Sequence, residues 1–216
     1  MSCTSRFLNR FTEIQYLKKL LKQKKLTLLN PELSWKDCND KEAMELYREN
    51  KNKKSIYALC LTDERETIHH WNTFAGGKNG CCIEFNYDKL INAIQREGVI
   101  SRSVEYYKIK DLRDLESIIE QLPFLKRCPF RPEKEFRIVA LCDEPQKKTF
   151  DIPIPLDSIQ KITITQQLPE SDYKNVEECI KSIYPEFKGI INHSTLLKNS
   201  KWIKTLHQKT NEETYQ

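Results

Sequence analysis

Apolar residues recur along the chain with two periods, and the two alternate from one end to the other. Spacings of three and four residues predict a helix from Thr12 to about Lys24. The apolar face of that helix consists of Ile14, Leu17, Leu20 and Leu21. A near-continuous apolar run at Ser55–Thr62 instead predicts a strand that is covered on both faces. Helices and strands are therefore expected to interleave.

The same patterns predict the remaining elements. Strands are expected at 26–29, 81–85, 99–109, 135–142, 159–165 and 189–191, and helices at 41–50, 64–74, 87–97, 112–122 and 173–183. Many of the strands are joined by short links, which favours a mixed, mainly antiparallel α+β sheet with surrounding helices over a doubly wound one. No repeat or composition break divides the chain, so we expect one α+β domain over residues 1–208 and a frayed polar tail over 209–216.

The chain of 216 residues carries a mild positive charge. Lys and Arg total 36 against 31 acids, which gives a formal net charge of +5. This excess is weaker and less clustered than in dedicated DNA-binding proteins. Two lysine-rich runs, residues 18–25 and 50–54, hold much of it. Each run is either a solvated surface or a contact for the phosphates of a nucleotide or nucleic acid.

The eight cysteines do not indicate disulfides or a metal site. The N-terminus lacks the apolar stretch of a signal peptide, and no C-x-x-C pair is present. We therefore expect a cytoplasmic protein with free thiols and no bound metal. Cys60, Cys81 and Cys82 lie in apolar strand-like runs, where cysteine behaves as a small hydrophobic residue. No segment is long and apolar enough to predict a membrane span.

Missing motifs exclude several common enzyme classes. The sequence contains no P-loop and no G-x-G-x-x-G nucleotide motif. It also lacks the G-x-S-x-G nucleophile turn and the H-E-x-x-H metal motif. Four clusters of polar and aromatic residues remain as candidates for a functional site.

The first two clusters lie near the N-terminus. Arg10 follows Asn9 and carries a planar guanidinium that suits a phosphate, although an ordinary surface arginine fits the pattern too. The second cluster is a polar turn that contains Trp35, Asp37, Asn39 and Asp40. Asp37 or Asn39 is a suitable helix cap, and acids bunched beside a tryptophan also suit a ligand site.

The third cluster contains His69, His70 and Trp71 on a predicted helix. Adjacent helical side chains point about 100° apart, so the two histidines cannot easily ligate one metal. One histidine can face a cleft and transfer a proton or orient a substrate, or the pair is structural. Trp71 fits a core position better than a stacking position.

The fourth cluster is Lys126-Arg127-Cys128-Pro129-Phe130, followed by Glu133, Glu135 and Arg137. The last three residues alternate, so in a strand they share one face. That face is either solvated or lines a polar cleft. In a cleft, a glutamate on a strand can bind a ribose hydroxyl or stabilise a developing positive charge.

In this order, the clusters resemble a bacterial family called domain of unknown function 2971. Its pattern begins with an aromatic-basic strand, followed by a strand that ends in proline and leads to a Trp/Phe-x-Asp-x-x-acid turn. A Ser/Thr-rich strand then leads to a helix ending in Trp. A Gly-x-x-Ile-x-Phe strand and an aromatic-x-x-Glu-x-Glu-x-Arg strand follow. The matching residues are Arg10-Phe11, Pro31, Trp35, Asp37, Asn39, Asp40, Cys60-Leu61-Thr62, Trp71, Gly80, Ile83, Phe85, Phe130, Glu133, Glu135 and Arg137. The resemblance spans residues 7–201. Lys36 and Cys38 depart from it, since many members carry Asn and Pro there.

More distantly, the layout resembles ADP-ribosyltransferase-like folds, which bind NAD in a split antiparallel sheet. The resemblance implies that Glu135 contacts the nicotinamide ribose and that His70 orients the acceptor or the ribose. The implied NAD-binding residues are Arg10 for the phosphates, Tyr57 or Trp71 for the nicotinamide, and Glu133 and Arg137. A further polar site is expected from Trp35, Asp37, Asn39, Asp40 and His69.

Three functions remain as hypotheses. The first is an NAD-consuming transferase or glycohydrolase, acting as a toxin or phage-defence effector on a nucleic-acid or protein acceptor. It requires Glu135 and Arg10 to converge in one pocket. The second is a nucleic-acid- or nucleotide-binding module without catalysis, which requires the two lysine-rich runs to form one surface. The third is a protein-interaction partner of a defence system.

Overall fold

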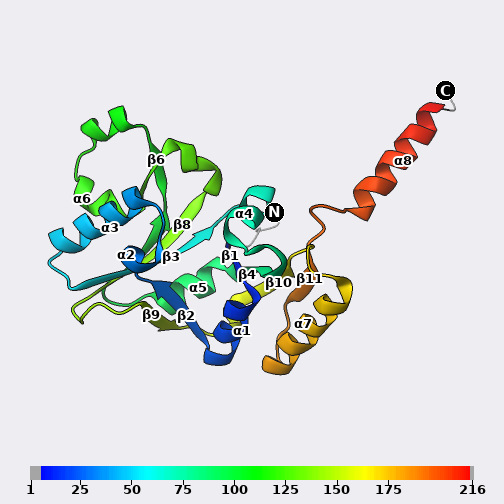
Figure 1. Cartoon of the computed structure of the whole chain (residues 1–216), viewed down its shortest axis with the longest axis horizontal. Helices are drawn as coiled ribbons and strands as arrows, with labels where there is room; N and C mark the ends of the chain where they lie inside the picture. The colour runs from blue at the N-terminus through cyan, green and yellow to red at the C-terminus, as the bar shows by residue number, and fades with distance from the viewer. Residues whose placement is uncertain (1–5, 215–216) are drawn as a thin grey trace.

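A nine-stranded sheet runs through the molecule in the computed structural model, which describes residues 6–214 (Figure 1). Seven strands follow one another in the order β11 (Ile190–His193), β10 (Ile159–Ile164), β4 (Gly80–Asn86), β1 (Phe7–Glu13), β3 (Ser55–Thr62), β2 (Lys25–Leu29) and β9 (Thr149–Pro153). β8 (Glu135–Cys142) pairs with β3 and with β5 (Val99–Ser103). The described pairs in this sheet are antiparallel except β10–β11. The predicted mainly antiparallel α+β architecture is confirmed.

The sheet is split between β1 and β3. β1 pairs with β4 over its whole length, but it meets β3 at one registered pair, Asn9 and Thr62. β2 meets β3 at one pair as well, Leu29 and Ala58. Between Ala58 and Thr62, β3 forms its described backbone pairs with β8 alone. Two halves of the sheet therefore diverge from Asn9 and Thr62.

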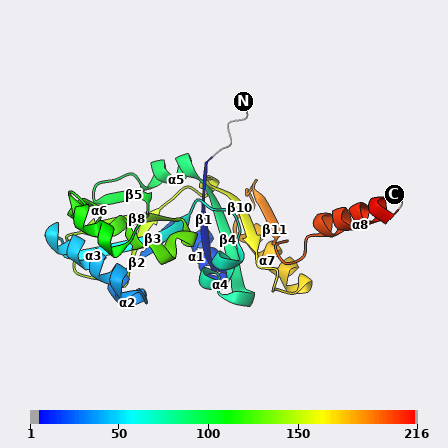
Figure 2. The same cartoon turned by 90° about the horizontal axis from the view of Figure 1, so that it is seen from above.

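Helices cover both faces of the sheet. On one face, α1 (Ile14–Gln23), α5 (Tyr87–Ile94) and α7 (Glu170–Ile183) bury their apolar sides in the main core. The α1 residues in that core are Ile14, Leu17, Leu20 and Leu21, as predicted. On the other face, α3 (Cys38–Asn50) packs against β3 and β8, and α4 (Ile68–Phe74) packs against β1 and β4. α3 and α4 thus lie on either side of the split (Figure 2).

Short elements fill the chain between β5 and β8. A parallel pair of strands, β6 (Glu105–Tyr107) and β7 (Leu125–Arg127), forms a separate small sheet. The short helices among residues 6–214 are α2 (Pro31–Ser34), α6 (Ile118–Gln121) and the 3-10 helices Gly77–Asn79, Ile109–Asp114, Leu122–Phe124, Cys128–Glu133 and Leu156–Ser158. The amide of Val104 donates to the carbonyl of Glu135 at 2.8 Å, which fixes this segment to the start of β8.

Three expectations need correction, and two short strands were not expected. The helix predicted at 112–122 is wrong, because these residues form the end of one 3-10 helix, a loop, the short α6 and the first residue of another 3-10 helix. The strand predicted at 99–109 is two strands, β5 and β6, which Val104 separates. The helix predicted at 64–74 begins at Ile68, because the Thr67 side chain caps its first turn. β7 and β9 were not predicted, since both are short and lie next to prolines or turns.

The C-terminal helix α8 (Ser200–Thr214) extends away from the body of the molecule (Figures 1 and 2). The predicted boundary at residue 208 falls inside this helix, so residues 209–214 are helical rather than frayed. Residues 1–5 and 215–216, the ends of the expected domain and tail, lie outside the described residues. Within residues 6–214, no helix combines the length and the apolarity that crossing a bilayer requires.

Candidate active site

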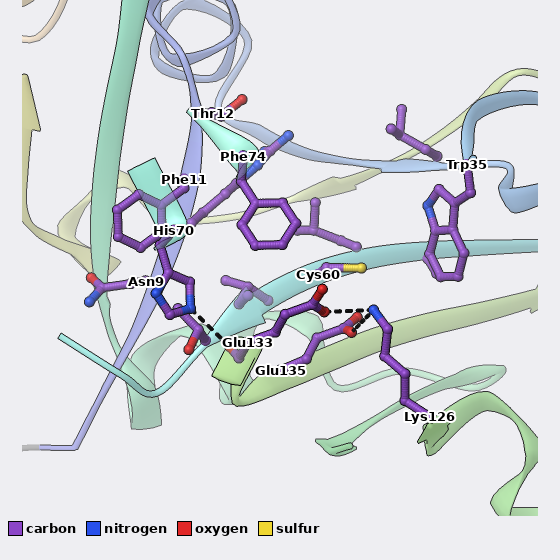
Figure 3. Close-up of a pocket in the computed structure, with 16 residues that line it drawn as sticks. Asn9, Phe11, Thr12, Trp35, Cys60, His70, Phe74, Lys126, Glu133 and Glu135 are labelled. Atoms are coloured by element: carbon purple, nitrogen blue, oxygen red, sulfur yellow. Dashed lines mark hydrogen bonds and ion pairs between the residues drawn. The ribbon is translucent and has the colours of Figure 1, made fainter. Parts of the chain in front are cut away.

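A cavity of about 240 Å³ opens where β1 and β3 diverge (Figure 3). β1 and β3 supply most of its walls, and α4 supplies His70 and Phe74. Lys126 comes from β7, Glu133 from the 3-10 helix Cys128–Glu133, and Glu135 from the first position of β8. The remaining lining residues are Asn9, Arg10, Phe11, Thr12, Leu29, Trp35, Ala58, Leu59, Cys60, Leu61 and Thr62. Residues far apart in the sequence thus converge here, and Glu135 and Arg10 both line the cavity, which the first hypothesis requires.

The floor of the cavity is a carboxylate, Glu135, bound to a buried arginine. Arg137 is 0% exposed, and its Nε lies 2.5 Å from Glu135 Oε1 while its Nη2 lies 3.0 Å from Oε2. The same guanidinium donates to Asp40 Oδ2 at 2.6 Å and to the carbonyl of Pro123 at 3.0 Å. A buried arginine with several donors satisfied is well placed to hold carboxylates rigidly. Arg137 lies beneath the cavity and is not part of its lining.

The ammonium group of Lys126 forms ion pairs with three carboxylates. Its Nζ lies 2.6 Å from Glu133 Oε2, 3.1 Å from Glu135 Oε2 and 3.4 Å from Asp40 Oδ2. The ammonium also lies 4.8 Å from the ring centre of Phe130. Three acids against two bases leave this cluster one negative charge in excess. Sequence reasoning missed Lys126 as a site residue.

The two glutamates differ in their tendency to hold a proton. Burial on its own would raise the pKa of Glu135, but Arg137 and Lys126 outweigh burial and lower the pKa to about 2. For Glu133, burial dominates over the nearby Lys126 and raises the pKa above its ordinary value. Burial likewise raises the pKa of Asp40, despite Arg137 and Lys126. Glu135 is therefore the firmly ionised carboxylate of the cluster, and Glu133 the one closer to exchanging a proton.

A turn in an unusual conformation separates Glu133 from Glu135. Lys134 between them has φ 40°, in the left-handed region that non-glycine residues rarely adopt. Glu133 belongs to a 3-10 helix, so it does not share a strand face with Glu135 and Arg137, which the alternation of the three residues had suggested. Both side chains nevertheless line the cavity. The amide of Glu135 donates to the Tyr106 hydroxyl at 2.8 Å, which anchors the turn.

Cys60 is open to the cavity, which corrects its expected role as a buried hydrophobic residue. Cys81 and Cys82 are buried as predicted. The protein atoms around the Cys60 sulfur, together with the Glu135 carboxylate, raise the pKa of this thiol well above its ordinary value. At neutral pH the group is thus a neutral thiol beside an ionised carboxylate.

His70 connects α4 to the loop before β8. It is 1% exposed, its Nε2 lies 2.9 Å from the carbonyl oxygen of Glu133, and its Nδ1 lies 2.7 Å from the Thr67 hydroxyl. An imidazole with its proton on Nε2 satisfies both contacts, donating to the carbonyl and accepting from the hydroxyl. The ring also stacks on Phe11 with centroids 5.1 Å apart. Both ring nitrogens are engaged, and the ring face forms part of the wall.

Aromatic rings enclose the space above the carboxylates. Phe11 and Phe74 come from β1 and α4, and Trp35 lies across the cavity from them (Figure 3). The Trp35 ring also lies 5.1 Å from the guanidinium carbon of Arg137. The arrangement combines flat apolar walls with a negatively charged floor.

Several predicted site residues lie elsewhere. Tyr57 is buried on the opposite face of β3, where it stacks on Phe150. Trp71 packs in the small core with Phe11, and its Nε1 donates to Glu66. His69 is exposed beside Phe74. Asp37 caps α3 by accepting from the amide of Asn39, so both serve the helix start next to Asp40.

Arg10 lines the cavity. Desolvation by its surroundings lowers the pKa of Arg10, although an arginine stays protonated at neutral pH.

The lysine-rich runs give less support to the second hypothesis, a nucleic-acid-binding module. In the second lysine run, Lys51 is paired with Glu120 and Lys53 with Asp143. The first run belongs largely to α1, on the face of the sheet opposite to α3. The two runs therefore do not form one uninterrupted basic surface.

Comparison with known proteins gives one family match and several similar folds. The model of a protein family of unknown function, DUF2971, matches residues 70–138, a segment that includes His70, Glu133, Glu135 and Arg137. This match confirms the resemblance over that segment. No curated protein matches the chain.

Solved structures of DarT from Thermus sp. 2.9 are similar at low identity. The complex with ADP-ribosylated ssDNA has 13% identity and a TM-score of 0.45, covering 88% of this chain and 94% of that chain. The complex with carba-NAD+ has 11% identity and a TM-score of 0.45, covering 88% and 96%. The complex with NAD+ has 13% identity and a TM-score of 0.43, covering 90% and 98%. At this level of similarity, nothing is carried from those structures to the residues of the cavity.

Proposed function

We propose that the chain is an ADP-ribosyltransferase-like enzyme that consumes NAD+, with its reaction centre in the cavity between β1 and β3. One observation carries the proposal: Glu135 is held fully ionised at the floor of an aromatic-walled cavity. A fixed carboxylate in a partly desolvated site stabilises positive charge far better than water does. Cleavage of the nicotinamide glycosidic bond develops such a charge on the ribose carbon.

The cavity suits the nicotinamide riboside half of the substrate. Its volume of about 240 Å³ is slightly below the usual range for ligand pockets, roughly 300 to 1,000 Å³, so the rest of a dinucleotide would lie outside it. Phe11, Phe74 and Trp35 offer flat faces to a pyridinium ring, and the ionised carboxylate of Glu135 in the same cavity favours a cation. Arg10, which also lines the cavity, supports contact with the phosphates. Tyr57 and Trp71, the ring-packing candidates from sequence, have no part in this proposal.

The two glutamates would take separate roles. Glu135 accepts a hydrogen bond from a ribose hydroxyl and stabilises the charge on the ribose carbon. As the C1′–N bond breaks, nicotinamide leaves with the bonding electron pair. An acceptor oxygen or nitrogen, or water in a glycohydrolase, forms the new bond to C1′, and its proton passes to Glu133, whose raised pKa suits a base. No other reactant is needed.

His70 would act as a positioning residue rather than as a proton carrier. Both of its nitrogens are engaged, and one holds the carbonyl of Glu133. Replacing it would shift the Glu133–Glu135 turn and the Phe11 wall together. A His70→Gln variant, whose amide can keep one contact, should retain more turnover than His70→Ala.

The test is NAD+ turnover by the purified protein, with and without cell lysate as a source of acceptors. The wild-type chain should release nicotinamide or transfer a label from NAD+ to a macromolecule. Glu135→Gln should lower the rate by about 10²- to 10³-fold, the usual effect of removing one electrostatic stabiliser. Glu32→Gln, which removes an exposed carboxylate on α2, should not change it.

A second variant covers the risk that Glu135→Gln disturbs folding. Cys60→Phe fills the cavity and leaves the Glu135–Arg137 pair in place, so it should abolish turnover with an unchanged circular dichroism spectrum. If NAD+ neither binds to nor is consumed by the wild-type chain in either condition, the proposed function is wrong.

An NAD+-consuming activity would also give the protein a biological setting. Loss of NAD+ or modification of an essential macromolecule harms a cell, which supports the role of a toxin or phage-defence effector. Induced expression of the wild-type chain in a bacterial host should stop growth, and expression of Glu135→Gln at the same level should not. Equal growth of the two strains would count against this setting.

A further inference from the structure

Three hollows follow one another on the α4 side of the sheet. The cavity shares Asn9 with a second hollow of about 460 Å³, which lies over β1, β4 and β10. The second hollow shares Glu66 with a third hollow of about 760 Å³ at the base of α8. We call the second and third hollows the groove. It leads from the candidate reaction centre to the projecting helix.

Three of the four cations that line the groove make no ion pair among the described residues. Arg65, Lys198 and Lys201 line it and make no ion pair among the described residues, and Lys161 lies 3.9 Å from Glu66. The acids of the groove are already engaged. Glu66 accepts from Trp71 Nε1 and from the Ser194 hydroxyl, and Glu84 accepts from Gln160. Positive charge therefore remains available to a ligand.

Aromatic side chains accompany these cations. Trp202 lies in the first turn of α8, lines the third hollow and is 67% exposed. Phe7 lines the second hollow and is half-buried. Unpaired cations beside the exposed ring of Trp202 and the partly exposed ring of Phe7 suit a polymer that carries phosphates and unpaired bases. A duplex stacks its bases inside the helix, so they cannot contact the aromatic rings of the groove. An acidic peptide would match the cations of the groove but not its aromatic rings.

Asn9 stands at the junction between the groove and the cavity. It is 4% exposed, and its Nδ2 donates to the carbonyl of Glu64 at 2.9 Å, while its Oδ1 has no hydrogen-bond partner among the described residues. A buried acceptor without a partner is unfavourable unless a ligand supplies a donor. The amino group of a nucleobase that passes this point is such a donor.

We propose that the groove binds a single-stranded nucleic acid and presents one of its nucleotides to the cavity as the acceptor. The acceptor role rests on the proposed function, whereas binding of the strand does not. DNA and RNA both carry the phosphates and unpaired bases that the groove recognises. Strands of each with the same sequence are therefore compared to identify the natural ligand.

The test measures binding of fluorescent single-stranded DNA and RNA of one sequence, by anisotropy over a series of salt concentrations. Wild-type protein should bind a single strand more tightly than the duplex. Arg65→Glu combined with Lys201→Glu should weaken binding at least tenfold and reduce the salt slope by about 1.4, since each phosphate contact on a single strand contributes about 0.7. Trp202→Ala should weaken binding several-fold and leave the slope unchanged.

The matched control is Lys19→Glu combined with Lys22→Glu. It makes the same charge change with exposed residues of α1, which covers the opposite face of the sheet. Binding by this variant should stay within about twofold of wild type. Equal losses in the two double variants, or no preference for a single strand over the duplex, would overturn the proposal.

A last arm separates this proposal from the proposed function. Glu135→Gln should bind the strand normally, and wild-type protein with labelled NAD+ should label the strand. Strand binding that depends on Arg65 and Lys201, without any NAD+ turnover, keeps the groove and overturns the proposed function. Label that appears on protein and never on the strand overturns the acceptor role of the groove.

Discussion

Glu135 and Arg137 form a two-point contact within one strand, with Nε 2.5 Å from Oε1 and Nη2 3.0 Å from Oε2. Their side chains lie on the same face of β8, because residues two apart in a strand share a face. A buried ion pair is stable only when further groups satisfy its remaining donors and acceptors. Asp40, Lys126 and the Pro123 carbonyl do so here. This completed network keeps a buried carboxylate ionised.

Breaking that network should cost much more than breaking a surface pair. Arg137→Met leaves Glu135 and Asp40 buried without their main counter-charge, so we expect the free energy of unfolding to fall by about 3–5 kcal/mol. Urea unfolding followed by circular dichroism measures this loss. Lys147→Met, which removes the exposed pair with Glu144, is the matched control and should change little. A loss in Arg137→Met no larger than the control would show that the network is not structural.

Stability should decline in acid through Glu135. Its pKa is about 2 in the folded chain against about 4.3 when unfolded. Because the folded pKa is lower, the contribution is fully present above about pH 5 and is lost as the pH falls toward 2, amounting to about 3 kcal/mol. Asp40 and Glu133, whose pKa values are raised, act in the opposite sense.

Urea midpoints measured from pH 6 to pH 3 test this dependence. Wild-type stability should fall over that range more steeply than that of Glu135→Gln, which lacks the titrating group. Parallel curves for the two proteins would mean that Glu135 titrates normally in the folded state.

Lys126 should set the acidic limb of the activity profile. Its ammonium partly offsets the effect of burial on Glu133, so Lys126→Met should raise the pKa of Glu133 further. A base must lose its proton to act, and therefore the acidic limb of kcat/KM against pH should move to higher pH. Lys126→Arg should keep the limb near its wild-type position. A purely structural lysine would change the rate without moving the limb.

Cys60 should report occupation of the cavity. The Cys60 thiol is open to the cavity, and its pKa is raised. Because the thiolate is the reactive form, alkylation of Cys60 should be slow at pH 7. The rate should rise with pH, and this rise should begin at a higher pH than for an ordinary thiol. NAD+ should slow the reaction by covering the sulfur. Mass spectrometry of alkylated peptides gives the rate, with buried Cys81 and Cys82 as unreactive references. Alkylation that NAD+ leaves unchanged would place the substrate elsewhere.

Local patterns in the sequence predicted the strands and the helix that surround this site. Ser55–Thr62 and Glu135–Cys142 have the predicted bounds, because long apolar runs of strand-forming residues leave little ambiguity. The helix after β1 has the predicted buried face. Glu135 and Arg10 both line the cavity, which the first hypothesis requires.

Non-local packing decided what sequence patterns missed. Lys126 comes from a small separate sheet, and no local signal shows that it would reach Glu135. Cys60 lies in an apolar run, and it is exposed because β1 and β2 leave that edge of β3 open. Tyr57 lies three positions from Cys60 and so points to the opposite face, which the strand period alone could have shown.

The central claim is that Glu135 stabilises the charge developed when the nicotinamide bond of NAD+ breaks. Nicotinamide release under single-turnover conditions tests it most directly, with wild type, Glu135→Gln and Glu133→Gln compared at equal concentration. We predict that Glu135→Gln loses about 10²- to 10³-fold in rate, and that Glu133→Gln still releases nicotinamide while transferring little label to an acceptor. Release at the wild-type rate by a folded Glu135→Gln protein would contradict the account.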